Sequence, residues 1–335
     1  MTEFWTAALA LTILLYVLLD GFDLGVGMLL ILMPDERGRR HMLAAIAPVW
    51  DGNETWLVLS ATVLFGVFPL VYSTLLSAFY LPMMAMLAGL ILRGVSFEFR
   101  EKSRRNRAFW DWCFILGSLV ASFIQGMTVG ALVKGLPIVD GRYTGSAFSW
   151  FSPFAFLCGL GLCLGYALLG AGWLTHKTTQ DVQTLAFRLL PRLLGAVLAF
   201  LLVIFVYSLT LDLAVMHRWL ERPVLFVFPL FGAIVCAAMA FSIQHRRELI
   251  PFLCGIAIFA AAFATLAVSF YPYMIPFSVT IAQAAAPQSS QAFIFWGAGI
   301  IVLPITVIYT LVVYFVFKGK VTDRESYDDA ANSSE

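Results

Sequence analysis

Long apolar runs separated by short polar segments extend along most of the chain. Nine of these runs have about twenty residues or more, which is the length an α-helix needs to cross roughly 30 Å of hydrocarbon. We place them at residues 4–32, 43–72, 76–98, 110–133, 153–174, 191–214, 223–243, 249–270 and 291–317. They lack the roughly ten-residue alternation of a membrane barrel strand. The pattern therefore predicts an all-α polytopic membrane protein made of helical bundles, with nine transmembrane helices.

We expect a single transmembrane helical domain over residues 1–320. The tail that follows, residues 321–335, is polar, acidic and rich in serine, and this composition is typical of a disordered segment. The whole chain is 61% hydrophobic and 12% charged, with a mean hydropathy of +0.89. Such usage excludes an ordinary soluble domain. Nor does any basic patch indicate a nucleic-acid partner.

Most basic residues fall in alternate loops between the predicted spans. One set of loops, together with the C-terminal tail, holds sixteen of the 21 lysines and arginines: Arg37, Arg39, Arg40, Arg100, Lys102, Arg104, Arg105, Arg107, Lys177, Arg188, Arg192, Arg246, Arg247, Lys318, Lys320 and Arg324. The other loops hold Lys134, Arg142, Arg218 and Arg222. By the positive-inside rule the richer side is cytoplasmic. This predicts an external N-terminus and a cytoplasmic C-terminus. Asp111 stands at the start of a span on the basic side, and we expect it to cap or otherwise stabilise the N-terminus of that helix.

The sequence offers little visible catalytic machinery. The four histidines, His41, His176, His217 and His245, stand at span edges or in loops, so no span presents an imidazole at mid-membrane for haem or a metal. The five cysteines lie within apolar runs without a C-x-x-C pair, and we interpret them as packing residues. We therefore expect no cofactor and no metal in this chain.

Four carboxylates interrupt the first two apolar runs. Asp20 and Asp23 form one pair, and Asp51 and Glu54 form another; each pair has the i, i+3 spacing that places two side chains on one helix face. The loop between them is centred near Gly38, so an antiparallel hairpin would bring both pairs to a similar depth. Intramembrane acids are functional candidates because burying them is costly.

Neighbouring residues bear on what these acids do. Gly21, Gly25 and Gly27 remove side-chain bulk, which allows close helix approach. Arg93, within the third run, either extends its head to the interface or pairs with one of the acids, and the sequence leaves both alternatives open. A purely structural role for the acids also stays open at this stage.

Several segments in a fixed order resemble one family. They are Asp20–Gly27 (DGFDLGVG), Ala47–Trp56 (APVWDGNETW), Arg93 with Phe97–Arg100, Trp110–Trp112 with Gly117–Ser118, Ser152–Phe154, and Tyr271–Pro276. Together they resemble subunit II of the cytochrome bd-type ubiquinol oxidases, including the cyanide-insensitive branch. The resemblance extends from the first span to the loop before the last.

The resemblance implies a bacterial inner-membrane subunit without haem. It would pair with a subunit I that holds b-type and d-type haems and the ubiquinol site, and that reduces O2 to water without pumping protons. A small single-span subunit, membrane lipid and a structural quinone are further candidate partners. The resemblance also implies a proton path from the cytoplasm through Asp51, to which we add Glu54, although many relatives have Gln there. Asp20, Asp23 and Arg93 are then buried structural residues, and we expect changes at the two aspartates to affect assembly more than turnover.

The main alternative is an ion-coupled secondary transporter, because such carriers also place acids beside glycine and proline breaks at mid-membrane. Against it, the acids crowd into one helical hairpin and do not recur in a second half of the chain. A pure assembly scaffold with structural acids is the third interpretation.

Overall fold

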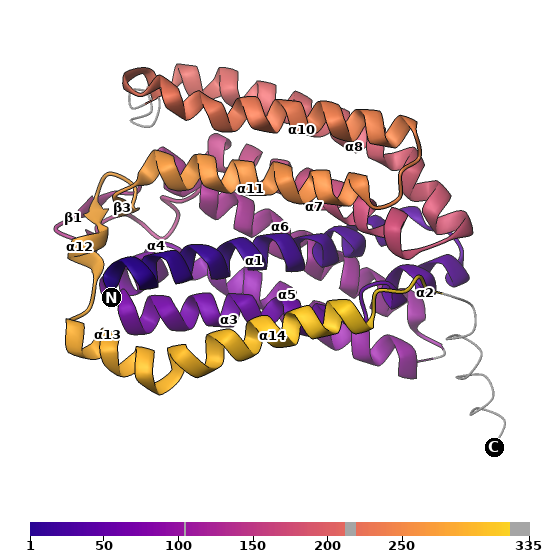
Figure 1. The fold of residues 1–335 in the computed structure, drawn as a ribbon, viewed down its shortest axis with the longest axis horizontal. Coiled ribbons are helices and arrows are strands. Elements are labelled where there is room, and N and C mark those ends of the chain that lie inside the picture. The colour runs from indigo at the N-terminus through magenta and orange to yellow at the C-terminus, as the bar shows by residue number, and fades with distance from the viewer. Residues whose placement is uncertain (104, 212–218, 322–335) are drawn as a thin grey trace.

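The computed structural model describes residues 1–103, 105–211 and 219–321 (Figure 1). Long helices lie side by side along the longest axis of the molecule. They are α1 (Thr2–Leu29, continued by the 3-10 turn η1, Leu30–Leu32), α3 (Trp50–Val67), α5 (Tyr80–Lys102), α6 (Arg107–Lys134), α7 (Pro153–Lys177), α8 (Gln180–Thr210), α10 (Val227–Gln244, preceded by η2, Pro223–Phe226), α11 (Ile250–Phe270) and α14 (Ile300–Val316).

Shorter elements connect the long helices. The helices are α2 (Glu36–Ala44), α4 (Pro69–Ala78), α12 (Ile281–Ala284), α13 (Gln288–Ile294) and the π-helical turn η3 (Phe295–Gly299). Two small antiparallel hairpins occupy the longer loops: β1 (Ile138–Val139) with β2 (Arg142–Tyr143), and β3 (Tyr273–Ile275) with β4 (Val279–Thr280). Arg104, His217, Arg218 and the predicted tail after Val321 lie outside the described residues.

Seven helices in the described part of the chain are long and apolar enough to cross a membrane, and the number reaches nine if each of two bent helix pairs is one span. The bent pairs are α3 with α4, at 118°, and α13 with α14, at 48°. The predicted all-α polytopic membrane fold is therefore confirmed. The two bent pairs correspond to the second and ninth predicted spans.

The second predicted span, residues 43–72, is not one helix. Its first residues belong to the short helix α2, which Asp35 caps by accepting a hydrogen bond from the Gly38 amide at 2.7 Å. The spanning helix α3 begins at Trp50 and ends before Phe68. Pro69 then begins α4, and because a residue before proline is disfavoured in a helix, the chain bends at Phe68.

The sixth span begins earlier than predicted. We placed its start at residue 191, yet α8 begins at Gln180 and carries Pro191 inside the helix. The polar residues of the first turns of α8 hid this extension, because they interrupt the apolar run from which the span was predicted.

Helix α1 lies inside the bundle, where it packs against α7, α3 and α6 (Figure 1). Its glycines allow this close packing, as predicted. A Cβ at Gly25 would lie 1.8 Å from the carbonyl oxygen of Tyr166 in α7, and a Cβ at Gly170 would lie 2.6 Å from the Val26 amide nitrogen. The backbones of α1 and α7 therefore touch at this crossing, which places the acids of α1 deep in the protein.

The expectation for Asp111 was wrong. The N-cap of α6 is Asn106, and Asp111 is a buried residue, 1% exposed, within that helix. Its carboxylate accepts hydrogen bonds from Arg39, at 3.0 Å, and from Arg100. Glu36 of α2 also pairs with Arg100, at 3.1 Å. An ion network thus joins α2, α5 and α6 at the end of the bundle where basic residues gather.

A second polar cluster holds the described end of the chain against α7. The Lys177 ammonium donates to the carbonyl oxygens of Phe317 and Gly319, and the Val321 amide donates to the Lys177 carbonyl at 2.9 Å. Lys320 lies 2.8 Å from Glu248, which precedes α11. We call these contacts the C-terminal clamp.

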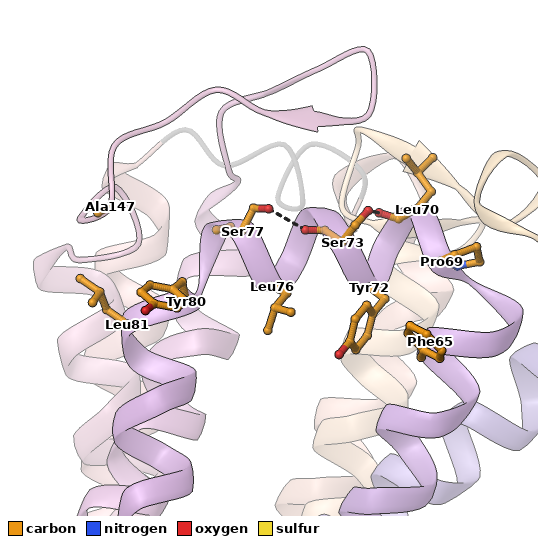
Figure 2. Close-up of a pocket in the computed structure, with 11 residues that line it drawn as sticks. Phe65, Pro69, Leu70, Tyr72, Ser73, Leu76, Ser77, Tyr80, Leu81 and Ala147 are labelled. Carbon is orange, nitrogen blue, oxygen red and sulfur yellow. Dashed lines mark hydrogen bonds between the residues drawn. The ribbon is translucent and has the colours of Figure 1, made fainter.

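A wide apolar groove lies under α4, between the end of α3 and the start of α5 (Figure 2). Its volume is about 960 Å³. Figure 2 shows Tyr72 and Leu76 pointing from α4 into the space between the two long helices. Tyr80 and Phe65 line it from α5 and α3. None of the four predicted acids lines this groove, so it is separate from the polar site described next.

Candidate functional site

Arg93 lies at the centre of a buried ion cluster. Its side chain is 1% exposed, and its Nη2 atom donates to Asp20 Oδ1 at 2.7 Å and to Glu54 Oε2 at 3.1 Å. Asp20 is fully buried, whereas the Glu54 side chain is 26% exposed. Of the two alternatives for Arg93, pairing with the acids is therefore the correct one. The cluster joins α1, α3 and α5.

Asp23 is also fully buried but has a different partner. Its Oδ2 atom accepts a hydrogen bond from the Asn53 amide at 2.7 Å. The same Asn53 group donates to the Leu19 carbonyl at 3.3 Å, and its oxygen accepts from the Tyr314 hydroxyl at 3.0 Å. Asp23 is thus linked through Asn53 to α14, the last span. The prediction that the acids of the first hairpin lie at a similar depth is confirmed for Asp20, Asp23 and Glu54.

Asp51 lies apart from this cluster. It is exposed on the outer face of α3, on the same stripe as Thr55 and Thr62. Glu54, three residues later, faces inward toward Arg93. The expected second acidic pair therefore lies on adjoining faces of α3, with Asp51 exposed and Glu54 turned toward the buried cluster.

A chain of polar side chains continues from Asp20 along the bundle. Tyr16 lies one turn before Asp20 on α1, and its hydroxyl interacts with the Asp20 carboxyl. Tyr16 accepts a hydrogen bond from the Gln125 amide at 2.7 Å, and Gln125 accepts one from the Tyr166 hydroxyl at 2.8 Å. Tyr166, Gln125 and Tyr16 each donate to the next member of this chain, which ends at Asp20. The chain therefore favours a negative charge on the Asp20 carboxyl group.

Some buried polar atoms of the cluster have no hydrogen-bond partner within the described residues. They are Asp20 Oδ2, Asp23 Oδ1, and Nε and Nη1 of Arg93. Leaving such atoms without a partner is costly in a bundle interior. Their concentration at one place is typical of a functional site and unusual for a purely structural ion pair.

Sequence reasoning missed Asn53, Gln125 and the three tyrosines that complete the site. Asn53 stands inside the WDGNETW segment, where a polar residue in an apolar span is itself a signal. Gln125 gives the same signal within the fourth predicted span. Among the described residues, no group of three or more His, Cys, Asp or Glu side chains is arranged to hold a metal ion.

Comparison with known proteins gives one consistent result. A family model described as cytochrome bd terminal oxidase subunit II matches residues 1–317. A probable cytochrome oxidase subunit 2 of Haemophilus influenzae is 30% identical over 354 residues, covering 93% of this chain and 89% of that protein. The cytochrome bd-I ubiquinol oxidase subunit 2 of Escherichia coli is 28% identical over 362 residues, covering 96% and 95%. The fold matches a chain in the structure of bd oxidase from Geobacillus thermodenitrificans with a TM-score of 0.77 at 18% identity, covering 94% and 98%.

Proposed function

The chain belongs to the family of cytochrome bd terminal oxidase subunits II, and we propose that within the oxidase complex it stabilises subunit I and supplies part of its proton path. It is one subunit of a membrane quinol oxidase, an oxidoreductase complex. In our proposal subunit I holds the b-type and d-type haems and the ubiquinol site. This chain contributes no haem and no catalytic centre of its own.

The position of Asp51 is the observation that carries this proposal. An ionisable side chain that faces lipid from a membrane helix costs several kcal/mol, so such residues face protein or water. Asp51 is exposed on α3 in the isolated chain. We infer that this face of α3 lies against subunit I and that Asp51 delivers protons there.

Glu54 extends the path toward the interior. It is partly exposed and contacts Arg93, so it connects the outer face of α3 with the buried cluster. Reduction of O2 to two waters consumes four electrons from quinol and four protons. A carboxylate near the cytoplasmic end of a span can pass protons from water to that reaction without pumping.

We propose a bacterial inner-membrane location, with the N-terminus outside and the C-terminus in the cytoplasm. The clustering of Arg39, Arg100 and Lys177 at one end of the bundle supports this orientation. A small single-span subunit and a structural quinone remain candidate additions to the complex. An ion-coupled transporter is the weaker alternative, because the acids lie in one helical hairpin, two of them pair with Arg93 of α5, and the relatives are oxidase subunits.

The test is an Asp51→Asn variant co-expressed with subunit I. Asparagine keeps the size and hydrogen bonding of the side chain but cannot carry a proton. We expect normal assembly and haem content, with quinol-driven O2 consumption per haem d reduced roughly tenfold or more. Asp181→Asn, the same change on the exposed first turn of α8, is the matched control and should keep full turnover.

Two outcomes would contradict the proposal. Full turnover of Asp51→Asn would remove this residue from the proton path. Loss of haem together with activity would favour the scaffold interpretation, in which the acids only hold the complex together.

A further inference from the structure

The cluster around Arg93 contains more negative than positive groups. Three carboxyl groups, those of Asp20, Asp23 and Glu54, surround one guanidinium. If all three were ionised, the cluster would carry two uncompensated negative charges in the bundle interior. Buried groups in that situation take up a proton, because the neutral form is far less costly to bury.

The two buried aspartates differ in the donors that hydrogen-bond to them. Asp20 receives a charged N–H from Arg93 at 2.7 Å, together with the polarised chain that ends at Tyr16. Asp23 receives only the neutral amide of Asn53, and its Oδ1 atom has no partner among the described residues. Charge-assisted hydrogen bonds are roughly twice as strong as neutral ones. Negative charge is therefore favoured on Asp20 over Asp23.

The groups that face Asp23 point to the same assignment. They are Asp20 on its own helix, Asn53 and Glu54 on α3, Arg93 on α5 and Tyr314 on α14. Arg93 is the cation of this set, and it donates hydrogen bonds to Asp20 and Glu54. Asp20 and Asp23 each have one carboxyl oxygen without a hydrogen-bond partner in the described part of the chain, and the two residues stand three positions apart on one helix face. A proton on Asp23 would remove the unsatisfied anionic oxygen at that position.

We propose that Asp23 is held as the neutral carboxylic acid and stores a proton for the path that Glu54 opens, while Asp20 is the permanent anionic partner of Arg93. The storage role rests on the proposed function, whereas the assignment of charge does not. In this arrangement Asp23 holds a proton inside the bundle, and Glu54, the partly exposed member of the cluster, connects it with the outer face of α3. The two aspartates, equivalent in the sequence motif, have opposite roles.

The test compares Asp23→Asn with Asp20→Asn in the complete oxidase complex. An amide reproduces a neutral acid, because its oxygen accepts from Asn53 and its NH2 group takes the place of the protonated oxygen. We expect the unfolding equilibrium of Asp23→Asn in mixed detergent micelles to change by less than about tenfold. Asp20→Asn leaves Arg93 without its closest anion, and we expect a shift of about a hundredfold or more. This prediction departs from the sequence-based expectation that both changes act on assembly.

A stable Asp20→Asn complex beside an unstable Asp23→Asn complex would overturn the charge assignment. If Asp23→Asn is stable, its turnover per haem d should fall, since the store has been removed; unchanged turnover would overturn the storage role. The Asp51→Asn measurement keeps this test separate from the proposed function. Full turnover in Asp51→Asn would contradict the proton path, while the comparison of the two aspartates would still report which one carries the charge.

Discussion

Replacing Arg93 with methionine tests whether the ion cluster holds the bundle together. Arg93 is 1% exposed and its closest partner, Asp20, is fully buried at 2.7 Å. Removing one partner of such a pair leaves an uncompensated buried charge, which costs about 3–5 kcal/mol of folding free energy. We therefore expect Arg93→Met to lower the unfolding free energy of the purified complex by about that amount, as measured by unfolding in mixed detergent micelles.

Arg40→Met is the matched control for this experiment. Arg40 is 47% exposed and lies 3.9 Å from Glu36, one turn away on the same helix, so its loss should cost about 0.3–0.5 kcal/mol. The double variant Arg93→Met with Asp20→Asn removes both charges and should recover most of the loss. An effect of Arg93→Met no larger than that of Arg40→Met, or a double variant worse than either single one, would refute the reasoning.

Two further predictions concern packing and pH. Gly25→Ala should destabilise the complex by about 1–3 kcal/mol, since its Cβ would lie 1.8 Å from the backbone oxygen of Tyr166. Gly195→Ala is the control, because a Cβ there would have no atom within 4 Å among the described residues, and it should be neutral or stabilising in the same unfolding assay. Equal effects of the two changes would contradict the close α1–α7 contact. Hydrogen bonds from Lys320 and Gln183 lower the pKa of Glu248, so its contribution to the C-terminal clamp is present above the ordinary glutamate pKa and is lost as the pH falls through the lowered value. Limited proteolysis should then cleave the C-terminal segment faster in acid and in Lys320→Gln at neutral pH, whereas Lys318→Gln should behave as wild type.

The spans could be predicted because membrane helices report their length directly in the sequence. In the described part of the chain, seven of the predicted spans are single long helices and two are bent helix pairs. The depth of the first acidic hairpin followed from counting residues on either side of Gly38. The errors arose where polarity and proline interrupt the pattern. Polar first turns concealed the start of α8, and the bend before Pro69 divided a run that hydropathy alone treats as continuous.

The site was predicted only in part because its remaining members come from distant helices. Asn53 joins Asp23 to Tyr314, which lies 261 residues later in the chain. Gln125 and Tyr166 reach Tyr16 from α6 and α7. No local spacing rule links such residues, since their contact depends on how whole helices cross. The direction of Asp51 was equally hidden, because periodicity places residues on a shared face without saying which neighbour that face meets.

In the proposed function, the different directions of Asp51 and Glu54 let one helix serve both a partner subunit and the buried cluster. Three residues advance a helix by about 4.5 Å and rotate it by roughly 300°, so the two carboxyl groups stand close together but on adjoining faces. Asp51 is exposed, while Glu54 contacts Arg93 and is 26% exposed. A cluster sealed entirely inside the bundle could not exchange protons with a reaction in another subunit. An exposed acid alone would have no connection to the buried charged cluster around Arg93. The first turn of α3 places an exposed acid beside one that contacts the buried cluster, which is the arrangement that the proposed proton path requires.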